Sequence, residues 1–371
     1  MLKPQSEEEL AGMIAGAEGP LAVQGGGTRG FAGAGEVLSS AGLSGIALYE
    51  PGALTLVAGA GTPLAEIKAA LAAENQRLAF EPMDHRALLG TTGTPTIGGV
   101  MSANVSGPRR IAVGAARDFA LGVRFVDGSG RIVKNGGRVM KNVTGYDLVK
   151  LLCGSFGTLG VLSEVAMKVL PAPETEASLV IGTTDVERAV AALSRGLGSA
   201  FEVTGAAFLP DRGAVVRIEG FEASVAYRLG ALEGVLSSFG GIERLDAAAS
   251  RILWQDVRDV QRFVGRAGDV WRVSVKPSDA PAVVATLPED ADYALDWGGG
   301  LIWVLCVEGT DLRARIAPLS GHATLVRADA QVRTQLGVFH PESPALAALT
   351  NGVRARFDPR GVLTTSGKMA A

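Results

Sequence analysis

The chain has 371 residues, which is enough for two or three domains of ordinary size. Its 35 basic and 38 acidic residues give a net charge of −3, so the charge balance does not favour nucleic-acid binding. The densest apolar run, residues 301–307, is too short to cross a bilayer, and the N-terminus lacks the apolar core of a secretion signal. Two cysteines cannot build a disulfide framework or an iron–sulfur site.

The N-terminal part predicts a helix, a strand and a glycine-rich turn. Ser6 and Glu9 have the spacing of a capping box that opens a helix over residues 6–17, and LAVQ at 21–24 is typical of a strand. The turn that follows, GGGTRG, satisfies the G-x-G-x-x-G pattern of dinucleotide-binding loops. A Rossmann turn must open a helix, however, and residues 31–45 are rich in glycine and lack a helical apolar period. The context therefore excludes a Rossmann site.

The rest of the first half predicts mixed structure. Strands IALYE and LTLVAG precede a helix with Thr62 as its N-cap and Pro63 at its first position. A stretch rich in glycine, threonine and proline, residues 82–107, leads to a hairpin over 120–137, a short helix over 145–154 and a long strand over 157–170. The segment PAPE, residues 171–174, marks a domain boundary.

In the second half of the chain, the pattern of predicted elements changes. Strand-like runs such as ASLVIG, AVVRIEG and LIWVLCV alternate with helical runs such as VERAVAALSRGL. This order predicts an α+β layer in which one antiparallel sheet is backed by helices. The tail is expected to form a helix followed by an extension that contains glycine and proline.

Three glycine clusters lie at turns of the first half: residues 25–27, residues 98–99, and Gly157 with Gly160. Glycines followed by Thr or Ser allow successive backbone N–H groups to point into one concavity, which suits phosphate oxygens. Each cluster alone is typical of an ordinary turn. Three clusters before one domain boundary favour a lobe that holds a pyrophosphate without a lysine cluster.

Four ordered motifs carry a family resemblance: SGPRR, RDFALGV, GGRVMKNVTGYDL and GSFGTLGVLSE. They resemble the FAD-binding domain of the vanillyl-alcohol oxidase/p-cresol methylhydroxylase (PCMH) superfamily. Within it, the sequence is most similar to the FAD-binding subunits of bacterial glycolate oxidase. The similarity is strong over residues 18–174 and extends further only in length and element order.

The resemblance implies a two-lobed α+β fold. Residues 1–174 would form a PCMH-type FAD-binding domain and residues 175–330 an antiparallel-sheet α+β cap domain. Residues 331–371 would form a helix and tail that return to the FAD lobe.

The resemblance also implies which residues bind FAD. The GGGT turn would wrap the pyrophosphate, residues 96–99 would lie beside the pyrophosphate and flavin, EPMD at 81–84 near the isoalloxazine, and GTLGV at 157–161 near the adenosine. The expected FAD-binding residues are Gly25, Gly26, Gly27, Thr28, Arg29, Pro82, Asp84, Thr96, Ile97, Gly98, Gly99, Asn104, Ser106, Gly107, Gly157, Thr158, Gly160 and Val161. Some relatives bond the flavin covalently through a His near the fourth position of the turn. Because Thr28 stands there, non-covalent FAD is expected.

Oxidation of a 2-hydroxy acid by a flavin requires a cation for the carboxylate and a base for the hydroxyl proton. Catalytic relatives carry clustered histidines with an acid, whereas this chain has only His85, His322 and His340, without the spacing of metal ligands. No metal is expected, and His322 and His340 are interpreted as structural.

Two catalytic candidates remain. His85 is one because EPMDHR would lie near the flavin, and Arg117 is the other, although Arg117 with Asp118 equally fits a structural ion pair. Arg109 and Arg110 are further candidates to face the flavin or a substrate anion.

Because the sequence offers so few catalytic candidates, two hypotheses about function remain. The first is an accessory or electron-relaying FAD subunit of a glycolate oxidase (glycolate dehydrogenase) complex that oxidises glycolate to glyoxylate. Its partners would be a catalytic flavin subunit and an iron–sulfur subunit. The second is a self-sufficient FAD-dependent 2-hydroxy-acid dehydrogenase. The missing histidine cluster favours the first. The expected location is the cytoplasm, or the cytoplasmic face of the inner membrane through the partner subunits.

Overall fold

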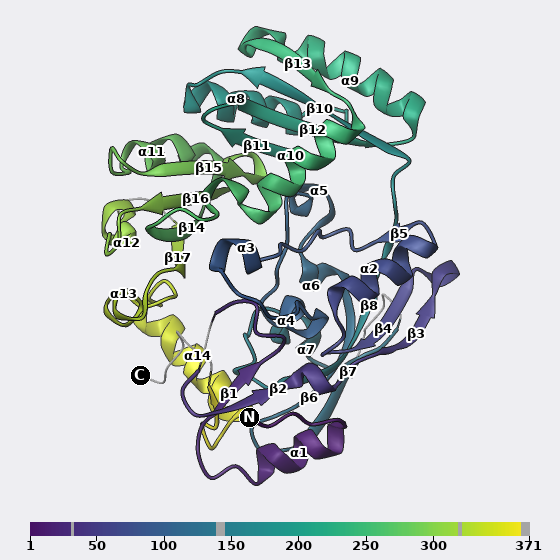
Figure 1. Ribbon diagram of the computed structural model, residues 1–371, viewed down its shortest axis with the longest axis vertical. Helices are drawn as coiled ribbons and strands as arrows, with labels where there is room; N and C mark the ends of the chain where they lie inside the picture. Colours follow the sequence, from purple (N-terminus) through teal and green to yellow (C-terminus); the bar gives the residue numbers. More distant parts are fainter. Residues whose placement is uncertain (31–32, 139–144, 318–320, 365–371) are drawn as a thin grey trace. The chain divides into compact units, whose positions relative to one another are not determined.

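A computed structural model of the chain describes residues 1–30, 33–138, 145–317 and 321–364 (Figure 1). The chain divides into two compact units: unit 1 holds residues 1–106, 114–172 and 341 onwards, and unit 2 holds residues 107–113 and 173–340. The main division after Ala172 lies two residues before the expected boundary at 174. The short segment 107–113 is part of unit 2, and the chain returns to unit 1 at Pro341 rather than at 331.

Unit 1 contains two larger sheets and a two-stranded one in its described residues. In the first, β1 is parallel to both of its neighbours, β2 and β18; in the second, five antiparallel strands follow the order β3-β4-β8-β6-β7, and β5 pairs with β9 separately. The strands are β1 (Leu21–Gln24), β2 (Glu36–Ser39), β3 (Ile46–Glu50), β4 (Thr55–Gly59), β5 (Gln76–Arg77), β6 (Ala120–Val126), β7 (Ile132–Gly136), β8 (Val161–Lys168), β9 (Leu170–Pro171) and β18 (Leu363–Thr364). The helices are α1 (Glu7–Ala15), α2 (Leu64–Ala73), α3 (Arg86–Leu89), α4 (Ile97–Ser102), α6 (Ala116–Phe119), α7 (Leu148–Leu152) and α14 (Pro344–Phe357).

Most of the caps and strands that the sequence predicts in unit 1 are present in the structure. The Ser6 hydroxyl caps α1 by accepting from the N–H of Glu9 at 3.1 Å, and the Glu9 carboxylate accepts from the N–H of Gln5 at 2.8 Å, one residue earlier than a standard capping box. The expected strands at 21–24, 46–50 and 54–59 and the 120–137 hairpin are confirmed, whereas the strand expected over 157–170 begins only at Val161 and forms β8. The expected N-cap at Thr62 is wrong, because Pro63 occupies the N-cap and the Thr62 hydroxyl instead donates to the carbonyl of Gly59 at 2.7 Å.

The tail packs on unit 1. The Asp358 carboxylate accepts from the N–H groups of Val362 and Leu363 at 3.1 and 2.7 Å, which shapes the turn between α14 and β18. Leu363 then pairs in register with Leu21 of β1. Within the motif GGRVMKNVTGYDL, residues 139–144 lie outside the described residues, as does the tail from 365.

Unit 2 is one eight-stranded antiparallel sheet with helices on its faces, in the order β13-β10-β12-β11-β15-β16-β14-β17 (Figure 1). The strands are β10 (Thr175–Gly182), β11 (Gly205–Leu209), β12 (Gly213–Gly220), β13 (Gly241–Leu245), β14 (Asp269–Val275), β15 (Asp292–Asp296), β16 (Leu301–Cys306) and β17 (Gly321–Arg327). The helices are α5 (Arg110–Val113), α8 (Val186–Leu197), α9 (Glu222–Leu236), α10 (Ala247–Asp259), α11 (Ala280–Ala285), α12 (Leu312–Ile316) and α13 (Ala330–Leu336).

Both faces of this sheet are covered at its β10 end. Leu179 and Ile181 of β10 pack in the core with α8 and α9, whereas the intervening Val180 packs in a separate cluster with Trp254 of α10. Because side chains alternate across a strand, a sheet covered on both sides needs apolar residues at nearly every position. This explains the continuous apolar runs that the sequence shows here, and the expected α+β fold is confirmed.

Within the described ranges, no helix is both long and apolar enough to span a membrane.

Candidate functional site

The glycine turn after β1 forms one wall of a cavity of about 270 Å³ within unit 1. A methyl group built on Gly26 would lie only 1.6 Å from the carbonyl oxygen of Thr94, so any side chain there would force the backbone apart. The N–H of Thr94 also donates to the carbonyl of Gly26 at 2.9 Å. At Gly27 the backbone has a positive φ of 75°, which favours glycine. The turn is therefore a closely fitted main-chain cradle.

A second part of the lining begins at Thr96, which caps α4 by accepting from the N–H of Gly99 at 3.3 Å. The hydroxyl of Thr91 donates to the carbonyl of Thr28 at 2.8 Å, so the segment before α4 is tied to the glycine turn at a second point. Two main-chain turns thus border one concavity, and such a concavity suits the oxygens of a pyrophosphate. The residues present fit the expected cofactor at this point.

Arg29, His85 and Phe156 form a polar and aromatic corner of the cavity. Arg29 Nη2 lies 3.3 Å from Nε2 of the buried His85, and its Cζ lies 5.7 Å from the centre of the Phe156 ring. A guanidinium can only donate hydrogen bonds, so Nε2 of His85 must be the acceptor. In this arrangement the ring carries its proton on Nδ1.

The cavity brings together part of the expected FAD-binding set. The expected residues that line it are Gly25, Gly26, Gly27, Thr28, Arg29, Thr96 and Gly99. The cavity is also lined by residues outside that expected set: Val23, Gln24, Gly30, Met83, His85, Pro95, Val100, Ser102, Ala103, Val105 and Phe156. Met83 and His85 belong to the EPMDHR segment that was expected near the flavin, and Gly30 ends the glycine turn. Phe156 carried a weak signal, since it stands in a Ser-Phe-Gly turn, and its φ of 57° is unusual for an aromatic residue.

Pro82 and Asp84 lie beside the cavity lining but outside it. Asp84 Oδ2 accepts from Arg86 Nη2 at 2.7 Å. Burial alone would raise the pKa of Asp84, but the hydrogen bonds from Arg86 outweigh it and hold that pKa below its usual value. The Asp84 carboxylate is thus paired with Arg86, two residues further along the chain.

The Gly157–Val161 segment and the pair Ile97–Gly98 serve packing in this structure. A methyl group on Gly157 would lie 3.0 Å from Val23 of β1, and one on Gly98 would lie 2.7 Å from Ala60. The Thr158 hydroxyl donates to the carbonyl of Ser155 at 2.7 Å, and Val161 begins β8. Ile97 and Val161 belong to the buried core, and Gly160 packs near Phe125.

Asn104 and Ser106, just before segment 107–113, form hydrogen bonds with the chain just after it. Asn104 Oδ1 accepts from the N–H of Arg117 at 3.0 Å, and the Ser106 hydroxyl accepts from the N–H of Ala116 at 2.9 Å. These two bonds join the chain on either side of the segment that enters unit 2. The Arg117 guanidinium is half-exposed and lies 3.8 Å from Asp118, which is the structural ion pair that the sequence allowed.

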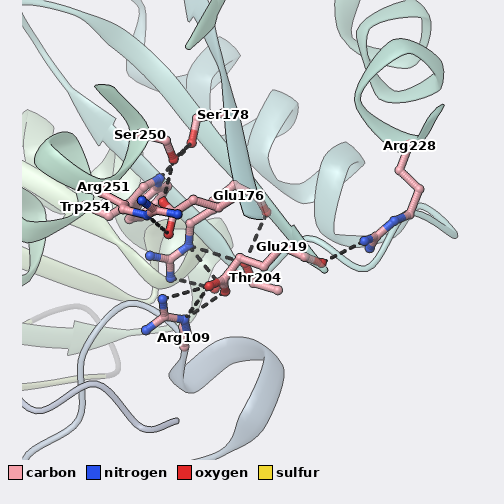
Figure 2. Close-up of polar contacts among 10 residues, drawn as sticks. Arg109, Glu176, Ser178, Thr204, Glu219, Arg228, Ser250, Arg251 and Trp254 are labelled. Carbon is pink, nitrogen blue, oxygen red and sulfur yellow. Dashed lines mark hydrogen bonds and ion pairs between the residues drawn. The ribbon is translucent and has the colours of Figure 1, made fainter. Parts of the chain in front are cut away.

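Segment 107–113 is anchored in unit 2 by an ion pair (Figure 2). Arg109 donates to both carboxylate oxygens of Glu219, with distances of 2.7–3.0 Å, and the two side chains are only 11% and 2% exposed. Arg217 lies 3.7 Å from the same carboxylate and stacks on Trp254 at 4.6 Å. Gly107, expected to bind FAD, accepts through its carbonyl from the Trp297 indole N–H at 3.1 Å.

Comparison with known proteins identifies the family. A family model described as an FAD binding domain matches residues 1–136. The chain is 35% identical over 357 residues to the glycolate oxidase subunit GlcE of Escherichia coli (strain K12), which covers 95% of this chain and 93% of that protein. A shorter match, 38% identical over 99 residues, joins it to the glycolate oxidase subunit GlcD of Bacillus subtilis, with 27% of this chain and 21% of that protein covered.

The chain is also similar to a D-lactate dehydrogenase in sequence and to a synthase in fold. A D-lactate dehydrogenase of Anaerostipes hadrus is 40% identical over 96 residues, 26% of this chain and 20% of that protein. Alkyldihydroxyacetonephosphate synthase shares the fold, with a TM-score of 0.67 over 97% of this chain and 76% of that chain at 14% identity. The expected PCMH-type fold and FAD cofactor are therefore confirmed: the chain is an oxidoreductase-family FAD-binding protein that belongs to the family of the glycolate oxidase subunit GlcE.

Proposed function

We propose that this chain is the accessory, electron-relaying FAD subunit of an assembly that oxidises glycolate to glyoxylate. The similarity to a glycolate oxidase subunit over nearly the whole of both chains supports this function. The observation that favours an accessory subunit over a self-sufficient dehydrogenase is the hydrogen bond between Arg29 and His85. His85 is the only histidine among the described residues that line the cavity. Its Nε2 lone pair accepts from Arg29 and is therefore not available to take a substrate proton.

The residues of the cavity have assignable tasks in this proposal. The backbone of Gly25, Gly26 and Gly27 would bind the pyrophosphate, and Arg29 would add a positive charge beside it. When bound, FAD supplies an acceptor for two electrons. His85, held by Arg29 through Nε2, would not remove a substrate proton through that nitrogen.

The partners in this proposal are a catalytic flavin subunit and an iron–sulfur subunit. A chain without a catalytic base can still support electron flow when a partner carries out the proton abstraction and hydride transfer. The assembly would act in the cytoplasm or at the cytoplasmic face of the inner membrane, where attachment would come from the partners.

The test is anaerobic mixing of the FAD-loaded chain with glycolate, alone and as a complex purified with its co-expressed partners. The proposal predicts that the visible flavin band of the isolated chain persists. In the complex the band should bleach and glyoxylate should form. Bleaching of the isolated chain at the rate of the complex would contradict the accessory role and establish a self-sufficient dehydrogenase.

A further inference from the structure

The glycine turn of unit 1 uses its carbonyl groups, and not its N–H groups, for hydrogen bonds with the other described residues. Three carbonyls accept from outside the turn: Gly25 from the Ser39 hydroxyl at 3.2 Å, Gly26 from the Thr94 N–H at 2.9 Å and Thr28 from the Thr91 hydroxyl at 2.8 Å. Within the described residues, the N–H groups of residues 25–28 donate no hydrogen bond. A turn whose acceptors are bonded and whose donors remain available suits an anion.

Gln24, the last residue of β1, places its side chain against this turn. A methyl group built on Gly27 would lie 2.8 Å from Gln24 Nε2, and Gln24 lines the same cavity as the turn. The side chain is partly buried, and its carboxamide makes no hydrogen bond with any described residue. Because an amide in a partly buried position normally has a partner, the two donors of Nε2 are available to a ligand in the cavity.

We infer that Gln24 is a cofactor-binding residue, which donates from Nε2 to a pyrophosphate oxygen held at the glycine turn. The position of Nε2 beside Gly27 favours a phosphate oxygen, because the N–H groups of the turn would hold that oxygen at the same place. The assignment rests on the proposed binding of the pyrophosphate at Gly25–Gly27. It adds a neutral side-chain donor to a site otherwise made of main chain and Arg29.

The test is a titration of the full chain with FAD, followed by the quenching of FAD fluorescence. Gln24→Met keeps the length of the side chain and removes its donors. Its FAD affinity should be about tenfold or more below that of the wild type, because a hydrogen bond to a charged group is lost. Gln24→Glu places a carboxylate next to the phosphate and should bind FAD more weakly than Gln24→Met at about pH 8.

The pH dependence separates a direct contact from a structural effect. A phosphate nearby raises the pKa of a carboxyl, so the carboxyl introduced by Gln24→Glu should take up a proton as the pH falls from about 8 to about 5. The affinity of Gln24→Glu relative to the wild type should then rise, whereas that of Gln24→Met should stay constant. Because Arg29 and His85 line the same cavity, each variant is compared with the wild type at the same pH.

Gln5→Glu is the matched control, since Gln5 lies in the same unit, is exposed and lies outside the cavity lining. It should bind FAD as the wild type does at each pH. The assignment is overturned if Gln24→Met binds FAD as tightly as the wild type, or if the deficit of Gln24→Glu is the same at both pH values. If Gln24→Glu does not fold, Gln24→Met alone decides.

The same titration distinguishes this assignment from the proposed function. A wild-type chain that does not bind FAD would overturn both the assignment and the site at the turn. The expected losses in the Gln24 variants, together with a flavin that glycolate does not reduce even in the complex with partners, would contradict the proposed function and leave this assignment standing.

Discussion

Gly26 is the residue on which the cofactor cradle depends most directly. The carbonyl of Thr94 occupies the space that a Cβ would need, at 1.6 Å from the built position. Gly26→Ala must therefore push the glycine turn away from segment 91–96 and disturb the aligned N–H groups. We expect FAD affinity to fall by about tenfold or more, equivalent to at least ~1.4 kcal/mol, in a fluorescence titration.

Gly52→Ala is the control for this substitution. Gly52 lies in the same unit, and a methyl group there meets nothing within 4 Å. Its FAD affinity should equal that of the wild type. Equal affinities of Gly26→Ala and the wild type would show that the pyrophosphate is not held at this turn.

His85 distinguishes the two roles of the chain. His85→Asn keeps an oxygen that can accept from Arg29 but removes any general base. For an accessory subunit we expect glycolate turnover of the purified complex to change by less than about threefold, whereas loss of a general base lowers turnover by about 10²–10⁴-fold. A loss in that range, with FAD content unchanged in the visible spectrum, would assign the base to His85.

Glu219 carries the attachment of segment 107–113 to unit 2. Glu219→Gln would remove the negative charge from the ion pair with Arg109, whose side chain is 11% exposed. Removing one partner of a buried ion pair typically costs ~3–5 kcal/mol, so the midpoint of urea unfolding should fall markedly. Glu233→Gln, whose partner Arg244 is half-exposed, should cost ~1 kcal/mol or less. Similar midpoints for the two variants would contradict the anchoring role.

At the scale of elements, we expect acid to weaken the docking of α1 on the five-stranded sheet. Glu7 accepts from Arg124 Nε of β6 at 3.1 Å and from the Ser163 hydroxyl of β8 at 2.5 Å. Burial raises the pKa of Glu7, but these hydrogen bonds outweigh it, so the net pKa lies below the usual 4.5. A folded pKa below the unfolded pKa gives stability that is complete above the unfolded value and is lost as pH falls through the folded value.

Glu7→Gln should therefore reduce stability most near neutral pH. The difference in unfolding free energy between wild type and variant should shrink as pH falls from about 6 to about 3, because the unfolded carboxyl titrates near ~4.3. Urea unfolding at several pH values measures it, with Glu8→Gln on the exposed side of α1 as the control. A difference that is constant with pH would rule out this contribution.

Elements with a strong local pattern could be predicted from the sequence. The strands of unit 2 and helices such as α8 follow apolar periods that burial then satisfies. Helix α4 could not be predicted, because Gly98 and Gly99 are poor helix formers. It forms because Thr96 caps it and Gly98 packs against Ala60. The cap is a local contact, but the contact with Ala60 is not visible in local sequence.

Thr62 and segment 107–113 show the same limit for long-range contacts. Thr62 follows a capping pattern but bonds to Gly45 and Gly59 instead, both brought close by the fold. The family resemblance placed Asn104, Ser106 and Gly107 at the cofactor, because they follow the TIGG stretch that would lie beside it. In the structure Asn104 and Ser106 brace the point where the chain enters unit 2, and Gly107 lies inside it, a topology that no local period encodes.

At the scale of the molecule, the two units differ in the polar groups that they contain. Unit 1 contains a main-chain cradle with few charges, suited to a pyrophosphate, whereas unit 2 contains a cluster of cationic side chains around Trp297. Segment 107–113 is the part of the first half of the chain that contributes to the second unit. The family membership supports FAD as the cofactor, and the glycine cradle of unit 1 is where we expect it to bind.

The central claim is that this chain itself holds FAD in the cradle at Gly25–Gly27. The most direct measurement is the visible absorption spectrum of the purified chain after incubation with FAD and removal of the unbound cofactor. The account predicts a flavin band in near-stoichiometric amount that acid precipitation releases into solution, as expected for a non-covalent cofactor with Thr28 in the turn. A chain that remains colourless after this treatment would contradict the account.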